Sequence, residues 1–246
     1  MSAVTKLFIS VYAVFAYIIG MSSLLWLVGF LINVVVPKAV DFGPSPPLPQ
    51  GYLTNIVIVA VYLSVHSVMA RPWFKQWWTR FIPEPVERAT YVLIAGVTTF
   101  VLVWAWQPMP EVVWRFENTA LVVFIYAFYA LAWLMMVTAT FNIDHWSFFG
   151  LRQVWTAVLG RSAKAAPFTA RFLYGVVRHP ISLGWLIVFW ATPHMSQGHL
   201  LLAVCVSIYI AVVTPIEESD LVTELGEDYV NYKKRVRAIL PWPRRL

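Results

Sequence analysis

The chain has 246 residues, of which 60% are hydrophobic and only 12% are charged. Soluble domains carry about 25% charged residues, so the composition excludes an ordinary soluble protein and indicates an integral membrane protein. The single cysteine, Cys205, excludes an internal disulfide and a multi-cysteine metal site, and we expect no metal. In a membrane protein, the net charge of +6 is typical of Lys and Arg residues at the cytoplasmic leaflet, so we expect no nucleic-acid partner.

The first 143 residues contain four apolar segments, and each is long enough to predict a transmembrane helix. Four prolines in 44–49 predict that 37–50 is an extended loop after the first segment. The stretch 71–88 is amphipathic and rich in tryptophan, which is typical of the membrane interface. We therefore predict a four-span bundle over 1–143. Its predicted spans are 7–36, 52–70, 89–107 and 118–143.

The remaining residues begin with a polar, basic loop over 144–179. An apolar run follows, with no Asp, Glu, Lys or Arg from Pro180 to Ile216, and the polar stretch 194–199 divides it into two pieces of about 17 residues. We expect a helix hairpin whose charged ends return to one face, followed by an amphipathic tail. His194 and His199 are interpreted as solvated residues of the far turn.

The predicted fold is thus an all-α integral membrane bundle of about six helices, made of four full spans, the hairpin and a cytoplasmic tail. We expect the whole chain, 1–246, to form a single membrane domain. Of its 18 Lys and Arg residues, only Lys38 and Arg115 lie on one side of this arrangement. Because positive charge accumulates at the cytoplasmic side, we predict that both termini are cytoplasmic.

Two adjacent carboxylates, Glu217 and Glu218, lie where the hairpin ends. Unpaired charge there costs several kcal/mol. Two interpretations remain open: the helix simply emerges into water, or one carboxylate accepts hydrogen bonds from ribose hydroxyls while the other pairs with an arginine. Arg178, at the opposite end of the hairpin, is the natural partner. A face with both signs of charge is suited to a small zwitterion.

The charged ends of the hairpin belong to a longer series of residues in the last third of the chain: Arg178, His179, Pro180, Gly184, Glu217, Glu218, Leu221, Gly226, Tyr229, Tyr232, Arg235 and Val236. The series resembles the signature of the isoprenylcysteine carboxyl methyltransferase and phospholipid methyltransferase superfamily. The resemblance implies a membrane enzyme that binds S-adenosyl-L-methionine in a cytoplasmic pocket formed by 178–246. It assigns cofactor contacts to Arg178, His179, Pro180, Gly184, Glu217, Glu218, Tyr229, Tyr232 and Arg235. The family often has tyrosine where Ser182 stands, so that contact is in doubt here.

A second resemblance covers nearly the whole chain and rests on the stretches 66–72, 87–92 and 141–154. Together they resemble the bacterial membrane-bound methanethiol S-methyltransferases, which are relatives of the NnrU-type proteins. This resemblance implies a multi-pass protein of the bacterial inner membrane that methylates methanethiol to dimethyl sulfide.

A thiol reacts as its thiolate, so the acceptor side needs a base or a neighbouring cation. His145 and His66 are the candidate bases, and Arg152 is the cation that would lower the pKa of the thiol. Asp144 is expected to orient His66 or Arg152 rather than its neighbour His145, because adjacent helical residues diverge. As alternatives, His66 is a packing residue, and His145 with Trp146 lies at the interface. Arg71, Arg80 and Arg88 are interpreted as snorkelling or lipid-facing.

Other readings of the same features remain open. The acceptor could be a prenyl-cysteine carboxylate or a lipid amine, although the extra amino-terminal spans argue against it. A haem-carrying or transport protein would instead need histidines that face each other, or polar residues at mid-membrane. The expected partners are a small thiol and membrane lipids.

Overall fold

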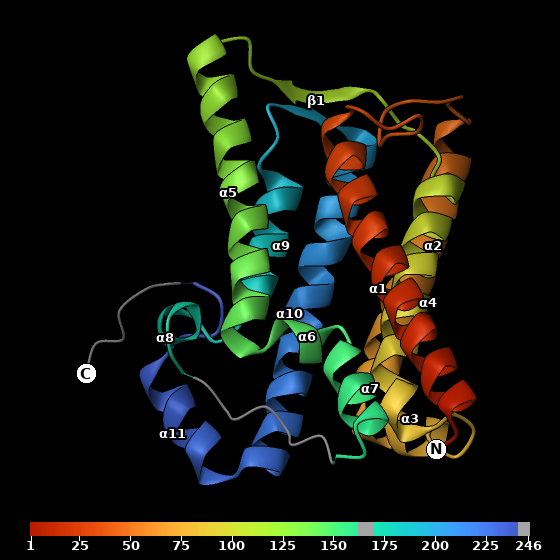
Figure 1. The fold of residues 1–246 in the computed structure, drawn as a ribbon. Helices are drawn as coiled ribbons and strands as arrows, with labels where there is room; N and C mark the ends of the chain where they lie inside the picture. Colours follow the sequence, from red (N-terminus) through yellow and green to blue (C-terminus); the bar gives the residue numbers. More distant parts are fainter. Residues whose placement is uncertain (162–169, 241–246) are drawn as a thin grey trace. The chain divides into compact units, whose positions relative to one another are not determined.

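The computed structural model describes residues 1–161 and 170–240 (Figure 1). Residues 162–169 of the predicted loop and 241–246 of the predicted tail lie outside this range. The described chain is largely helical, which agrees with the predicted fold class. Its elements are α1 (Ala3–Ile32), α2 (Leu48–Ala70), α3 (Pro72–Trp78), η1 (Glu84–Val86), α4 (Glu87–Ala105), β1 (Val112–Arg115), α5 (Thr119–Ile143), α6 (His145–Phe148), α7 (Leu151–Val158), α8 (Leu173–Val176), α9 (Pro180–Trp190), β2 (His194–Ser196), α10 (Gln197–Leu225) and α11 (Glu227–Arg235).

Five of these helices are long and apolar enough to cross a membrane: α1, α2, α4 with η1, α5 and α10. The four predicted spans correspond to the first four. The limits of these helices shift by a few residues from the predicted spans, and two regions differ further from the prediction. The extended loop ends at Pro47, because prolines are tolerated in the first turn of α2. The region predicted as a polar loop contains the short helices α6, α7 and α8.

The predicted hairpin has unequal arms. Helix α9 has 11 residues, about 16 Å, whereas α10 has 29. Because a proline disfavours helical conformation in the preceding residue, Pro193 prevents α9 from continuing through Thr192. Helix α10 then begins early, because the Ser196 hydroxyl accepts a hydrogen bond from the backbone N–H of His199. His199 is therefore a buried helical residue, 1% exposed, and its interpretation as a solvated turn residue was wrong.

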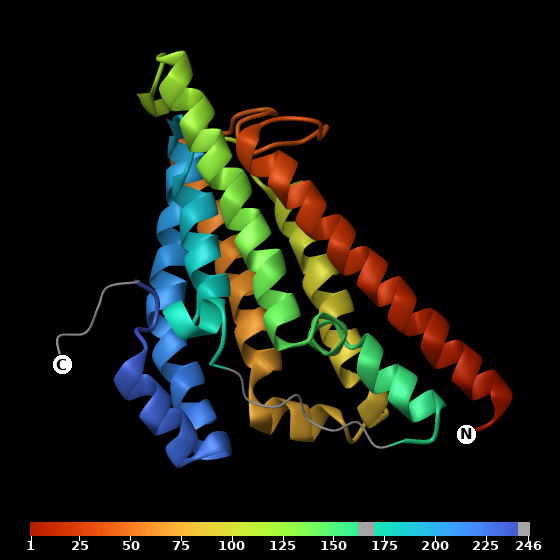
Figure 2. The ribbon, with the colours of Figure 1, turned by 60° about the vertical axis from the view of Figure 1, so that its left-hand side comes forward.

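The chain forms two compact units, which we describe separately. The first consists of Met1–Met109 and Asp144–Ala166, and the second of Pro110–Ile143 and Pro167–Leu246. In the first unit, α1 packs along α4, and α2 packs against α4 (Figures 1 and 2). Helix α7 lies beside α1 and η1, at the end of the unit that also carries α3 and the amino terminus.

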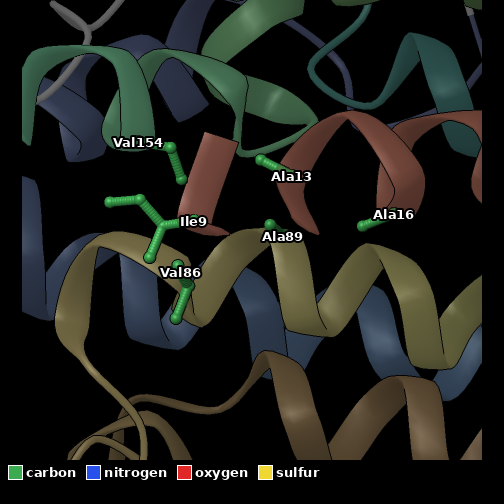
Figure 3. Close-up of a cluster of buried hydrophobic side chains, with 6 residues drawn as sticks. All are labelled: Ile9, Ala13, Ala16, Val86, Ala89 and Val154. Atoms are coloured by element: carbon green, nitrogen blue, oxygen red, sulfur yellow. The ribbon is translucent and has the colours of Figure 1, made fainter. Parts of the chain in front are cut away.

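Small residues allow α1, α4 and α7 to approach closely. One buried cluster joins these helices and is shown in Figure 3: Ile9, Ala13, Ala16, Val86, Ala89 and Val154. Gly150, with φ +85°, makes the turn between α6 and α7, and a Cβ at this position would lie 2.5 Å from the backbone nitrogen of Ala89. Only glycine therefore allows this turn to lie against the start of α4.

In the second unit, α9 packs against both α5 and α10. Gly184 faces α5, where a Cβ would lie 2.2 Å from Cγ of Met136. Strands β1 and β2 pair antiparallel at the end of the unit opposite α8 and α11 (Figure 1). After α11 the chain returns to α9, because the backbone N–H groups of Arg178 and His179 donate to the carbonyls of Arg237 and Ala238, at 2.8 and 2.9 Å.

Candidate functional site

The second unit contains a buried charged cluster centred on Glu218, which is 6% exposed. Its Oε1 atom accepts from Nε of Arg178 at 2.7 Å and lies 2.6 Å from Nη2 of the same guanidinium. Nε2 of His179 is 3.2 Å from this oxygen, and Nζ of Lys233 is 2.9 Å from Oε2. We call these four residues the Glu218 cluster. Both carboxylate oxygens are thus engaged by the protein itself.

Three segments distant in sequence build the Glu218 cluster. Glu218 lies near the carboxyl end of α10, and Arg178 and His179 immediately precede α9, where Pro180 occupies the first turn. Lys233 comes from the last turn of α11. The Arg178 guanidinium also donates through Nη1 to the carbonyls of Lys233, at 3.2 Å, and Val236. One buried arginine therefore ties α10 and the chain after α11 to the start of α9.

Glu217 is placed differently from its neighbour. Its side chain is 38% exposed, and its Oε2 lies 3.9 Å from Nδ1 of His179. Burial lowers the pKa of His179, although the hydrogen bond to Glu218 opposes this effect. The imidazole therefore favours its neutral form, which has a single ring N–H, and Nε2 donates this hydrogen to Oε1 of Glu218. The 3.9 Å separation of Nδ1 from Glu217 is longer than a hydrogen bond. The structure thus pairs Arg178 with Glu218, as expected, and leaves the Glu217 side chain more accessible, while ribose binding by Glu217 stays a prediction.

Tyr229 and Tyr232 lie on the buried face of α11, and each is 2% exposed. The Tyr232 hydroxyl donates to the carbonyl of Tyr174 at 2.5 Å. Burial, together with the negative charge of Glu218, raises the pKa of Tyr229 to about 12. Both tyrosines are therefore neutral at physiological pH, and they support the Glu218 cluster from the α11 side.

Two residues that were predicted to contact the cofactor do not contact the Glu218 cluster. Arg235 is exposed and its Nε donates to the carbonyl of Asn231 at 3.4 Å, within its own helix. Gly184 packs against α5, so the structure supports a packing role for it. Lys233 was missed by sequence reasoning, although it follows Tyr229 by one helical turn and therefore lies on nearly the same face of α11.

The first unit carries the predicted acceptor-side residues. Asp144 caps α6 by accepting from the backbone N–H of Ser147 at 3.2 Å. Its Oδ2 atom forms an ion pair with Nη1 of Arg152, at 2.6 Å. Asp144 therefore orients Arg152 rather than His145, as predicted. The Arg152 side chain is 52% exposed, so the pair adds little to stability but holds a cation at the start of α7.

His145 is buried, and its Nε2 lies 3.0 Å from the hydroxyl oxygen of Tyr17 on α1. The imidazole also packs against the rings of Phe149 and Trp146, with centroids 4.8 and 5.2 Å away. Burial lowers the pKa of His145, and the nearby charge of Asp144 partly opposes this shift. A neutral imidazole is the form that can accept a proton. The exposed indole at Trp146 suits the membrane interface, whereas His145 does not project into it.

His66 lies on α2 and contacts aromatic residues rather than Asp144. Its Nδ1 is 2.9 Å from the carbonyl of Tyr62, so this nitrogen carries the hydrogen. Its ring lies 6.3 Å from that of Tyr91. Arg88 also contacts this tyrosine: its guanidinium lies 4.7 Å from the Tyr91 ring centroid and 5.0 Å from that of Phe148.

The lipid-facing interpretation of Arg88 was wrong. Besides the two ring contacts, its Nε donates to the carbonyl of Phe148 at 2.7 Å, which ties α4 to α6. The sequence offers one signal for this role, since Arg88 opens the first turn of α4 three residues before Tyr91, at the spacing of helical neighbours.

These features describe a largely helical protein with five helices that are long and apolar enough to cross a membrane. A charged cluster lies in one unit, and the other unit contains His145 and the Asp144–Arg152 ion pair. Comparison with known proteins specifies the class further. No family model and no solved structure match the chain. Methanethiol S-methyltransferase from Mycobacterium tuberculosis is 43% identical over 96% of this chain and 96% of its own length. Methanethiol S-methyltransferase 1 from Bradyrhizobium diazoefficiens is 40% identical over 99% and 85%.

The chain therefore belongs to the methanethiol S-methyltransferase family, as the sequence resemblance implied. The similarity extends over both units, and it includes the residues of α6 and α7 as well as those of α9 to α11. A more distant similarity, 24% identity over 72% of the chain, relates it to nurim from Bos taurus.

Proposed function

We propose that this protein transfers a methyl group from S-adenosyl-L-methionine to methanethiol and produces dimethyl sulfide. The observation that carries this proposal is the 43% identity to a methanethiol S-methyltransferase over 96% of both chains. A prenyl-cysteine carboxylate or a lipid amine is a less favoured acceptor, because the first unit, with its three long helices, is shared with the thiol methyltransferases.

The Glu218 cluster and Glu217 fit the chemistry of the methyl donor. S-Adenosyl-L-methionine, when bound, supplies an electrophilic methyl group on a positively charged sulfonium. Glu217 presents a partly accessible carboxylate, which is suited to accept hydrogen bonds from ribose hydroxyls. Arg178 is buried and is held by Glu218 and by backbone carbonyls, so the position of its positive charge is fixed. The residues assigned to the donor are thus pre-organised by their contacts with one another.

We assign the acceptor thiol to the segment formed by α6 and the start of α7. A neutral His145 accepts the thiol proton, and Arg152, oriented by Asp144, stabilises the thiolate that forms. The thiolate sulfur would bond to the methyl carbon in line as the bond from this carbon to the sulfonium sulfur breaks, and S-adenosyl-L-homocysteine would be the leaving group. Such a displacement needs alignment and exclusion of water rather than covalent help from the protein. His66 supports the segment indirectly, through Tyr91 and the Arg88 contact with Phe148.

The experiment that tests this function is product analysis. Purified protein is incubated with methyl-labelled S-adenosyl-L-methionine and, separately, with methanethiol, hydrogen sulfide, a longer alkanethiol, a prenyl-cysteine and a lipid amine. We expect labelled dimethyl sulfide as the main product. Label in a prenyl-cysteine ester or a methylated lipid would identify the alternative acceptor. No transfer to any acceptor, together with a haem absorbance band, would refute the methyltransferase proposal.

His145→Ala tests the assignment of the base. Because His145 acts only on the acceptor, the variant should lose about 100- to 10,000-fold in turnover at pH 7 while its affinity for S-adenosyl-L-methionine stays nearly unchanged. The deficit should shrink at high pH, where the thiol ionises in solvent. A deficit that stays constant up to pH 10, or near-normal turnover at pH 7, would leave Arg152 as the main acceptor-side residue.

A further inference from the structure

The three side chains that contact the Glu218 carboxylate differ in how far a ligand can reach them. The side chains of Arg178 and His179 are 5% and 10% exposed, whereas that of Lys233 is 37% exposed. Arg178 also donates through Nη1 to two backbone carbonyls, so its guanidinium is engaged within the protein. The Lys233 ammonium has three N–H donors, and it contacts Oε2 of Glu218 at 2.9 Å. Lys233 is therefore the accessible cation of the Glu218 cluster.

The packing of α11 determines the position of Lys233. Gly226, with φ +61°, makes the turn after which α11 packs against α10 (Figure 1). Tyr229 and Tyr232 form the buried face of α11, and Lys233 lies at the edge of this face, one turn after Tyr229. The backbone carbonyl of Lys233 accepts from Nη1 of Arg178 at 3.2 Å. Both the main chain and the ammonium of this residue are thus held in place by the unit itself.

The charges around Lys233 favour an anionic group at this position. Glu218 carries one negative charge between the positive charges of Arg178 and Lys233, and His179 favours its neutral form. The Glu218 cluster therefore has one positive charge in excess. Glu217, with its accessible carboxylate, lies beyond His179. The imidazole of His179 and the carboxylate of Glu218 separate Glu217 from Lys233, so the site has a negative end and a positive end.

We propose that Lys233 binds the carboxylate at the amino-acid end of the methyl donor and thereby makes this carboxylate a requirement for tight binding. The inference rests on the proposed function, in which S-adenosyl-L-methionine is the donor and Glu217 accepts from its ribose. The donor is positive at its sulfonium and its amino group and negative only at its carboxylate, which is thus the group that an ammonium attracts. With the carboxylate at Lys233, the sulfonium lies further from this cation, whose charge would repel it.

The test compares Lys233→Gln with Lys234→Gln. Both changes remove one positive charge from the last turn of α11, but Nζ of Lys234 donates to Asn231 of the same helix, at 3.2 Å. Each protein is titrated calorimetrically with S-adenosyl-L-methionine and with its decarboxylated analogue, which keeps the sulfonium, the amino group and the ribose. We expect the wild type to bind S-adenosyl-L-methionine about 10- to 100-fold more tightly than the analogue, the scale of one charge-assisted hydrogen bond. Lys233→Gln should bind both nearly equally, and Lys234→Gln should keep the wild-type ratio.

The ratio of the two affinities separates recognition of the carboxylate from a purely structural role. Because Lys233 also bonds Glu218, a distorted site would weaken both ligands, whereas loss of a carboxylate contact weakens only S-adenosyl-L-methionine. Lys233→Arg keeps the charge and should retain the preference. An unchanged ratio in Lys233→Gln, or the same loss of preference in Lys234→Gln, would overturn the proposal.

The wild type alone provides a further test that needs no variant. Equal binding of the two ligands by the wild type would overturn the role of Lys233. If the wild type prefers S-adenosyl-L-methionine but methylates no thiol, the proposed function fails, while the ratio in Lys233→Gln still decides the role of Lys233. If it binds neither ligand, the methyl donor is wrong and both proposals fail.

Discussion

Replacing Glu218 by glutamine would neutralise the carboxylate at the centre of the Glu218 cluster while nearly keeping its shape. The Arg178 guanidinium, 7% exposed, would then lose its counter-charge, and the bond from Lys233 would weaken. Removing one partner of a buried ion pair costs about 3–5 kcal/mol. Because the glutamine oxygen retains part of the bonding, we expect a loss of about 3 kcal/mol in the free energy of unfolding. For a chain of this length, that lowers Tm by about 6–12 °C.

Glu217→Gln is the matched control, since it makes the same chemical change one residue earlier. The Glu217 side chain is 38% exposed and lies 3.9 Å from His179, so the loss of its charge should change stability by less than about 1 kcal/mol. Its effect should instead fall on ligand binding. Loss of one charge-assisted hydrogen bond should weaken S-adenosyl-L-methionine by about 1–3 kcal/mol.

Two measurements separate these effects. Unfolding of the purified proteins in the same detergent, followed by tryptophan fluorescence, gives the Tm values without ligand. Calorimetric titration with S-adenosyl-L-methionine, at a temperature where all variants are folded, gives the affinities. The reasoning is refuted if Glu217→Gln is as unstable as Glu218→Gln. The donor site is misplaced if both variants bind S-adenosyl-L-methionine as tightly as the wild type.

Three further predictions follow from the same structure. Gly184→Ala should destabilise the protein by about 1–3 kcal/mol, because the added methyl group overlaps Met136. The further change Met136→Ala should recover part of the lost Tm. No recovery would exclude the packing of Gly184 against Met136. Burial lowers the pKa of both His145 and His179 in the folded protein, so the unfolded chain binds protons more readily than the folded one. The free energy of unfolding should therefore fall as pH drops below about 6.5. The fall should be smaller in the double variant His145→Gln, His179→Gln. The proline-rich loop is proposed to lie outside the inner membrane and both termini inside, so Ser45→Cys in a Cys205→Ser background should react with an impermeant maleimide on intact spheroplasts. Labelling only after lysis would reverse this topology.

Much of the fold is predictable from the sequence because hydropathy is a local property. The residues of a segment such as 118–143 predict a transmembrane helix by themselves, whatever the segment packs against. In the structure, α5 has nearly the same limits. Prediction was weaker where a boundary depends on backbone chemistry. Helix α9 ends before Pro193, and α10 begins early, at the Ser196 cap. The two arms of the hairpin are therefore unequal in length, and His199 is buried.

The candidate site was predictable as a set of residue types, and the resemblance to known methyltransferases supplied their grouping. The place of Arg178 at the opposite end of the predicted hairpin also indicated its pairing with one carboxylate. Which carboxylate pairs depends on how α10 is rotated about its axis, because successive helical residues point about 100° apart. That rotation is set by the packing of α10 against α9 and by the return of the chain after α11. It places Glu218 inside and leaves Glu217 accessible.

Only the tertiary structure shows which residues from distant segments contact one another. The sequence by itself determined that the protein is a helical membrane protein, where its apolar segments lie and which polar residues are unusual within them. It did not reveal that Tyr17 contacts His145, that Arg88 binds the Phe148 carbonyl or that Lys233 completes the bonding of Glu218. Each contact joins residues brought together only by helix packing, whose geometry depends on small residues such as Ala13, Ala16 and Gly150 acting together. Such packing is a property of several segments at once, and no single stretch of sequence contains it.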